Sequence, residues 1–248
     1  MADWCLYLYV FLCISIAFIC KGLVGFGDPL IYNPLLSIQM NNSSITPTMV
    51  PVNLVSNVRM VIKNRRSFDK TIVIPIAVFV LLGCIPGSII LKIGAPMSLK
   101  LVLGLLIIGI GIEMWTRKPS KKHKKNMIVL ALLSFCSGIT AGLYGIDLFF
   151  VAYLERVSDN REYFRANMCF VFLVEGIFRI IMYVASGIIT LQTLIFTCIG
   201  IPAMFIGMYV GGLLDKKVND KLARKFIIIV FILGGISTTI AAATAIWG

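Results

Sequence analysis

The chain has 248 residues, of which 59% are hydrophobic and only 14% are charged, and its formal net charge is +12. Soluble domains carry about 25% charged residues, and a chain this apolar lacks the polar side chains that cover a water-exposed surface. The composition therefore excludes an ordinary soluble domain, and a nucleic-acid partner is not expected because the positive charges lie in short loops between apolar runs.

Apolar runs fill most of the chain and predict membrane-spanning helices, each of which needs roughly 20 apolar residues. The first run follows an acidic Met1-Ala2-Asp3, unlike the basic start of a signal peptide, so we expect it to be retained. The pattern predicts an all-α, multi-pass integral protein of the cell membrane. The expected segments are 4–37, 46–62, 71–91, 98–116, 127–154, 164–186, 189–213 and 224–247.

The first and fifth segments are longer than one crossing requires, and glycines interrupt both of them. Glycine and proline break helices, and broken backbone survives at membrane depth only when it is buried in protein or lines a wet cavity. We therefore expect both interruptions to be buried in protein or to line a wet cavity. They read Gly22-Leu-Val-Gly25-Phe-Gly27-Asp28-Pro29 and Gly138-Ile-Thr-Ala-Gly142-Leu-Tyr-Gly145-Ile-Asp147.

The two halves of the sequence resemble each other. A shift of about 118 residues lays Asp28 near Asp147, and a shift of 120 lays 46–68 on 166–188. The same shift of 120 lays Gly87 on Gly207. Duplicated halves with broken helices at equivalent places are typical of secondary transporters. The pattern predicts two repeats of about four segments each, over residues 1–120 and 121–248.

Lysines and arginines in the loops favour one topology. If all eight segments cross the membrane, the loops place 10 Lys and Arg on each side. If the first and fifth segments are re-entrant hairpins, 18 lie on one side and two on the other. The positive-inside rule prefers the second arrangement. It predicts inverted repeats, each with one hairpin and three spans, and places both termini outside.

Two arginines within the segments are candidate ligands for an anion. An ionisable residue at membrane depth costs about 2.5–3.5 kcal/mol on insertion scales, so each one indicates a function or a partner. Arg59 and Arg179 occupy matched positions, and a guanidinium can hold an oxyanion through two hydrogen bonds. The alternatives are snorkelling of Arg59, which lies near Lys63, and an ion pair between Arg179 and Glu175 one turn earlier.

Three carboxylates are candidates for proton coupling. Asp28 and Asp147 lie at the glycine-rich breaks, where each could either exchange a proton or act as a helix N-cap. Glu175 could either couple proton movement or serve as the ion-pair partner of Arg179.

Neutral groups complete the predicted substrate site. At the breaks, free backbone N–H groups at Gly25, Gly27, Gly142 and Gly145 favour negative charge. Two asparagines could either donate hydrogen bonds to the substrate or join helices together. These are Asn53 and Asn57, which share one helix face.

Small residues also predict close helix packing, and other chemistry has little support. Small-xxx-small spacing favours helix contact, and the four glycines with this spacing are Gly83, Gly87, Gly207 and Gly211. The seven cysteines have no CxxC spacing, and His123 stands among lysines. We therefore expect no metal, no cofactor and no catalytic cluster.

The glycine-rich elements resemble those of the sulfite exporter TauE/SafE family. The resemblance is carried by Gly22–Leu36, its second copy Gly138–Leu154, and the elements Gly83–Gly87 and Gly200–Gly211. The chain keeps Pro34-Leu35-Leu36 but has Asp28-Pro29 where the family has further glycines, and Ala152-Tyr153-Leu154 replaces the second proline motif.

The resemblance implies a secondary transporter for sulfite, a sulfonate or a related organic anion, with proton coupling as an expectation. Its partners would be this small anion and the lipid bilayer. An anion channel and a non-transporting accessory or sensory membrane subunit stay open as alternatives.

Overall fold

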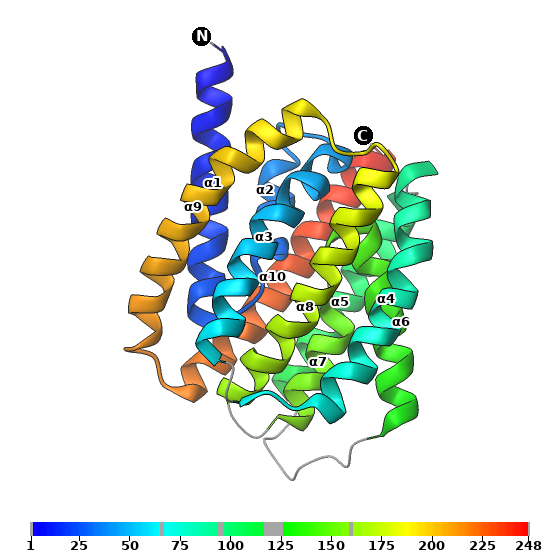
Figure 1. The fold of residues 1–248 in the computed structure, drawn as a ribbon, viewed down its shortest axis with the longest axis vertical. Helices are drawn as coiled ribbons and strands as arrows, with labels where there is room; N and C mark the ends of the chain where they lie inside the picture. The colour runs from blue at the N-terminus through cyan, green and yellow to red at the C-terminus, as the bar shows by residue number, and fades with distance from the viewer. Residues whose placement is uncertain (1, 65–66, 94–96, 117–125, 159–160, 248) are drawn as a thin grey trace. The chain divides into compact units, whose positions relative to one another are not determined.

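A computed structural model describes residues 2–64, 67–93, 97–116, 126–158 and 161–247, and these residues form ten helices (Figure 1). The predicted all-α class is confirmed, and the eight predicted segments correspond to eight helices or helix pairs. The helices are α1 (Ala2–Val24), α2 (Asp28–Leu36), α3 (Asn42–Asn64), α4 (Lys70–Ile93), α5 (Met97–Thr116), α6 (Met127–Tyr144), α7 (Leu148–Val157), α8 (Arg161–Ala185), α9 (Leu191–Asp215) and α10 (Asp220–Trp247).

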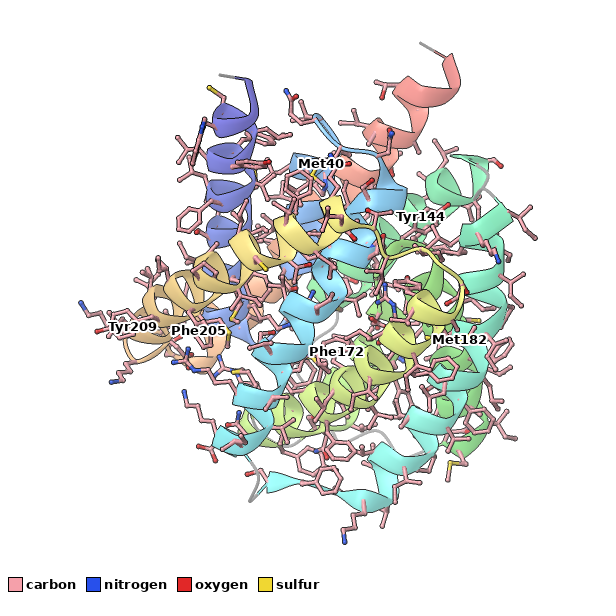
Figure 2. The ribbon with its side chains drawn as sticks, turned by 45° about the horizontal axis from the view of Figure 1, so that its top comes forward. Met40, Tyr144, Phe172, Met182, Phe205 and Tyr209 are labelled. Atoms are coloured by element: carbon pink, nitrogen blue, oxygen red, sulfur yellow. The ribbon has the colours of Figure 1, made fainter. Side chains whose placement is uncertain are left out.

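Several helices have the length and apolar surface of membrane spans. Large hydrophobic side chains are exposed along them, as with Phe205 and Tyr209 on α9, which are 43% and 62% exposed (Figure 2). Such a surface suits lipid rather than water. Among the described residues, the candidate spans are Trp4–Val24, Lys70–Ile93, Met127–Tyr144, Glu162–Ala185 and Leu191–Asp215, and the shorter apolar helices are Leu101–Thr116 and Phe231–Thr244.

Helix α3 is different. The segment predicted at 46–62 is helical, but α3 is not among the candidate spans of the described residues. Polar side chains that are buried in the protein account for this, because they lower the hydropathy of the helix. A membrane crossing by α3 stays a prediction. The buried polar residues are Thr46, Thr48, Ser56 and Asn57.

The chain divides into two compact units, and each unit draws helices from both halves of the sequence. Unit 1 contains α1, α2, α5, α9 and α10, and unit 2 contains α4, α6, α7, α8 and α3 from Thr46 onwards. The division of the sequence at residue 120 stays a prediction about internal repeats, because the units are built across it.

In unit 1, α1 and α9 lie side by side because glycines let their backbones approach (Figure 1). A Cβ atom on Gly207 would collide with the carbonyl oxygen of Ser15, and one on Gly211 would collide with that of Ile19. A Cβ atom on Gly22 would lie 2.8 Å from the carbonyl oxygen of Met208. A larger residue at any of these positions would force the two backbones apart.

In unit 2, α4 and α6 make the same kind of interface (Figure 1). A Cβ atom on Gly83 would collide with the carbonyl oxygen of Phe135, and one on Gly87 would collide with that of Ile139. Gly142 approaches the carbonyl oxygen of Cys84 in the same way, at 2.8 Å for its Cβ position. The predicted close packing is confirmed for all four glycines, namely Gly83, Gly87, Gly207 and Gly211.

The two glycine interfaces have the same spacing of contacts. A shift of 120 residues carries Ile19 on α1 to Ile139 on α6, and a shift of 124 carries Gly87 on α4 to Gly211 on α9. Gly207 on α9 therefore takes the place that Gly83 takes on α4. The sequence shift of 120 residues instead matches Gly207 with Gly87, which lies one helical turn after Gly83.

The breaks in the first and fifth segments are tight turns that share a positive-φ glycine and one backbone hydrogen bond. Gly25 and Gly27 between α1 and α2, and Gly145 between α6 and α7, have φ values of 103°, 93° and 70°, which favour glycine. The amide of Gly25 donates to the carbonyl of Lys21 at 2.7 Å, and that of Gly145 donates to Ala141 at 2.8 Å. The predicted helix breaks are confirmed, and they align at a shift of 120 residues. The prediction of free N–H groups is wrong for Gly25 and Gly145, because both amides are hydrogen-bonded within their turns.

Each broken segment doubles back on itself. The Tyr9 hydroxyl on α1 donates to the carbonyl oxygen of Leu35 near the end of α2. In unit 2, the Asn126 amide, directly before α6, donates to the Tyr153 hydroxyl of α7 at 3.2 Å. The short helices α2 and α7 therefore return along α1 and α6, and each helix pair is a hairpin.

Candidate functional site

A polar chain of contacts crosses the interior of unit 2. Three side chains spaced four residues apart on α8 share one helix face. Arg179 Nη1 donates to Glu175 Oε1 at 3.1 Å, and Arg179 Nη2 donates to the Tyr183 hydroxyl at 3.2 Å. The Tyr183 hydroxyl in turn donates to the carbonyl oxygen of Gly142 at 3.4 Å. The arginine is thus held beside the last turn of α6, next to the α6–α7 break.

Burial removes the charged groups of this arrangement from bulk water and leaves one donor of Arg179 unpaired. The side chains of Arg179 and Glu175 are 7% and 3% exposed, so both charges are removed from bulk water. Arg179 Nε is buried and has no hydrogen-bond partner in the described part of the chain. A buried donor left unpaired costs about 1–3 kcal/mol, more when it is charged. An oxyanion that accepted from Nε would remove this penalty.

The ion pair between Arg179 and Glu175, left open by the sequence, is present. Asp147 and Cys84 also lie within electrostatic range of Arg179. Two carboxylates therefore accompany one guanidinium, and a negatively charged ligand at Arg179 would meet them both.

The second predicted arginine lies in another environment. Arg59 is exposed on α3, whereas Arg179 is buried on α8. The two helices contact each other where a Cβ atom on Gly176 would lie 3.3 Å from the Leu54 side chain. A substrate role for Arg59 stays a prediction, but the two arginines are not equivalent in burial.

The two asparagines lie on the same helix as Arg59. Asn57 is buried, and Asn53 is half-buried with its carbonyl oxygen accepting from Ser56 Oγ at 2.8 Å. Their predicted contact with substrate is compatible with this burial, and so is the alternative role in joining helices.

The carboxylates at the two breaks occupy different positions. Asp147 is the N-cap residue of α7, but its side chain does not cap the described first turn of that helix. Asp28 is the first residue of α2, and Gly27 takes the N-cap position before it. With the breaks aligned at 120 residues, Asp147 corresponds to Gly27 and Asp28 corresponds to Leu148. The match of the two aspartates indicated by the sequence is therefore off by one residue.

In unit 1, Asp28 has a partner that the sequence analysis missed. Lys21 Nζ lies 3.4 Å from Asp28 Oδ1, and both side chains are 2% exposed. The available signal was that these two residues are the only charged ones in the segment 4–37. Tyr183 was missed as well, and its spacing of four residues from Arg179 was the signal for it.

Metal chemistry gains no support from the described residues, which contain no group of three His, Cys, Asp or Glu side chains able to hold an ion. His123 and the basic loop around it lie outside the described residues. The absence of a metal and of a cofactor stays an expectation.

Comparison with known proteins places the chain in a family. No curated protein and no solved structure matches the chain. A family model described as Sulfite exporter TauE/SafE matches residues 10–238, which include both glycine turns and both buried ion pairs. The chain belongs to the sulfite exporter TauE/SafE family and is a multi-pass membrane transporter of the plasma membrane, not an enzyme.

Proposed function

We propose that this transporter moves sulfite, a sulfonate or a related small organic anion by secondary transport. The observation that carries the proposal is the buried guanidinium of Arg179, whose Nε has no partner among the described residues. A guanidinium presents five donors in a planar fork that suits sulfite and sulfonate oxygens. Arg179 is therefore the residue that we expect to contact the anion first.

The backbone of the α6–α7 break is the second part of the proposed site. Gly142 and Gly145 lie next to the Tyr183 contact and the start of α7. The N-terminus of α7 carries a partial positive charge that favours an anion. Gly25 and Gly27 take the matching place in unit 1, at the start of α2.

Proton coupling follows from the charge around Arg179. Glu175 already neutralises the guanidinium, and Asp147 adds a second negative charge within range. An incoming anion would be repelled unless one carboxylate became neutral. We therefore expect a proton to travel with the anion, carried by Glu175, Asp147 or, in unit 1, Asp28.

We infer that residues 1–120 and 121–248 are inverted repeats whose first elements are re-entrant hairpins. Both broken segments double back, and their turns align at 120 residues. The hairpin arrangement also places 18 loop Lys and Arg on one side of the membrane. Cysteines introduced in the loop 215–225 should react with a membrane-impermeant reagent from the inner side. Reaction from the outside would overturn this topology.

The function is tested by uptake of radiolabelled sulfite into proteoliposomes of the purified protein, with and without an imposed pH gradient. We expect saturable uptake that follows the gradient and is lost in Arg179→Gln. Arg156→Gln, at an exposed arginine in the last turn of α7, serves as the matched control and should keep wild-type uptake. Flux that does not saturate would favour a channel. No flux of sulfite or of sulfonates would favour an accessory subunit.

A further inference from the structure

The hairpin of unit 1 contains an ion pair that the Arg179 site does not use. Lys21, in the last turn of α1, faces Asp28, the first residue of α2, across the turn that contains Gly25 and Gly27. Both side chains are almost completely buried, and Lys21 Nζ lies 5.4 Å from the centre of the Phe18 ring, a distance that suits a cation–π contact.

The carboxylate of Asp28 has hydrogen-bonding capacity that its described contacts leave unused. Charge-assisted N–H···O contacts usually measure about 2.7–2.9 Å, so the Lys21–Asp28 distance of 3.4 Å is long. The second carboxylate oxygen, Asp28 Oδ2, is buried and has no hydrogen-bond partner within the described ranges. A buried ion pair offsets the loss of hydration only when its remaining lone pairs are satisfied. A proton on Asp28 would remove the negative charge from this unpaired oxygen.

Among the residues that the structure describes, ionisable side chains of α1 face Asp28. On α1, Cys20 lies within electrostatic range, in addition to Lys21. α10 packs on the hairpin through Gly234 against Leu30, and its residues 226–247 include no Asp, Glu, Lys or Arg. Lys21 is therefore the charged side chain that loses its ion pair when Asp28 becomes neutral.

The start of α2 adds a positive potential at the same place. The N-cap residue Gly27 has no side chain to cap the helix, and Asp28 follows it directly. The N-terminal end of a helix favours negative charge through its backbone N–H groups. An anion beside Lys21 would gain from this potential once Asp28 no longer carries a negative charge.

We propose that Lys21 and Asp28 form an anion-binding site in unit 1, in which a proton on Asp28 releases Lys21 to bind an anionic oxygen of the substrate. This rests on the proposed transport function and adds Lys21 to it. Without the ligand, the ammonium and the carboxylate neutralise each other. With the ligand, an O–H bond has formed on Asp28, and the anion neutralises the ammonium.

Both states of this site are electrically neutral. The exchange therefore takes up one proton with each monoanion and leaves no unpaired charge in the protein interior, where such a charge would be strongly unfavourable. For an anion bound in unit 1, this assigns the accompanying proton to Asp28.

The test is calorimetric titration of the purified full-length protein with methanesulfonate, which stays a monoanion throughout the neutral pH range, and with sulfite. Runs in two buffers of different ionisation enthalpy report the protons taken up per bound anion. We expect about one proton for the wild type, by the exchange described above, and weaker binding at higher pH because a proton is taken up. Asp28→Asn should bind methanesulfonate at least as tightly, without proton uptake.

The double variant Lys21→Met/Asp28→Asn separates binding from folding. It removes both charges together, so no buried charge is left unpaired, and thermal unfolding should confirm that it folds. We expect its methanesulfonate binding to be at least tenfold weaker than that of Asp28→Asn. Lys92→Met, at an exposed lysine in the last turn of α4, is the matched control.

Each outcome decides the proposal. Equal binding by the double variant and by Asp28→Asn would overturn it, as would proton uptake that persists in Asp28→Asn. In both cases the Arg179 site would stand if Arg179→Gln still abolished binding. If the wild type bound neither anion and transported no sulfite, the proposed function would fail together with this inference.

Discussion

In unit 1 both members of the buried ion pair lie on the hairpin itself, with Lys21 before the turn and Asp28 after it. In unit 2 the charged pair lies on α8, and the hairpin contributes the carbonyl of Gly142 and the nearby Asp147. The glycine hydrogen bonds that begin the two turns nevertheless correspond at a shift of 120 residues, from Gly25 and Lys21 to Gly145 and Ala141. A shared backbone framework thus carries two different arrangements of charge.

The side chains that close the two turns also occupy corresponding positions but differ in their donor groups. In unit 1, Cys20 Sγ donates to the carbonyl of Phe26 at 3.9 Å, and in unit 2 Thr140 Oγ1 donates to that of Ile146 at 2.7 Å. The partners correspond at 120 residues, although the donor is a weak thiol in one turn and a hydroxyl in the other. The positions of these turn contacts are common to both units, and the donor groups are specific to each.

The largest effect is expected where the shared framework itself is broken. A Cβ atom added by Gly211→Ala would collide with the backbone of α1, and one added by Gly87→Ala would collide with that of α6. Each variant should lose about 3 kcal/mol of stability, since backbone cannot yield as a side chain does. Thermal unfolding of the purified protein in detergent would measure the loss.

The neighbouring glycine provides the control for this prediction. A Cβ atom on Gly212 would meet no described atom within 4 Å, so Gly212→Ala should keep or slightly raise the unfolding temperature because alanine favours helix. Equal losses in Gly211→Ala and Gly212→Ala would contradict the close approach of α1 and α9.

A smaller effect is expected at the charged site of unit 2. Arg179→Lys keeps the positive charge beside Glu175 but loses the planar fork that also reaches Tyr183. We expect kcat/KM for sulfite uptake to fall about tenfold or more, which is roughly 1.4 kcal/mol. Arg59→Lys, at an exposed position, should have a smaller effect. Equal losses in both variants would instead support the prediction from the sequence that Arg59 and Arg179 bind the anion as a pair.

The sequence predicted features that depend on local spacing. Glycines marked both breaks, with a proline at the first, and the spacing of four residues anticipated the pair of Glu175 with Arg179. The contact of Lys21 with Asp28 requires the chain to reverse direction, which the spacing of residues along one helix does not indicate. The match of Asp28 with Asp147 followed residue identity, whereas the true alignment of the turns follows backbone geometry and lies at Gly25 and Gly145.

Tyr183→Phe should have a moderate effect, because it removes one hydroxyl and leaves both charges in place. The hydroxyl accepts from Arg179 and donates to the carbonyl of Gly142, so its loss frees the guanidinium from α6. A typical hydrogen bond contributes about 1 kcal/mol net, and we expect sulfite uptake to fall several-fold. Tyr209→Phe, on the exposed face of α9, should leave uptake unchanged, and a similar loss in both variants would argue against a specific role for Tyr183.

The smallest effects should come from the tyrosines that close the hairpins, and they should be confined to one hairpin each. Tyr9→Phe removes the bond to the carbonyl of Leu35, and Tyr153→Phe removes the contacts with the backbone of Asn126. Each loss is worth about 1 kcal/mol, which corresponds to roughly fivefold faster amide exchange in the freed helix. Hydrogen–deuterium exchange should therefore speed up in α2 for Tyr9→Phe and in α7 for Tyr153→Phe. Faster exchange in both short helices for either variant would mean that the two hairpins open together, and the division into two units would then not describe their local stability.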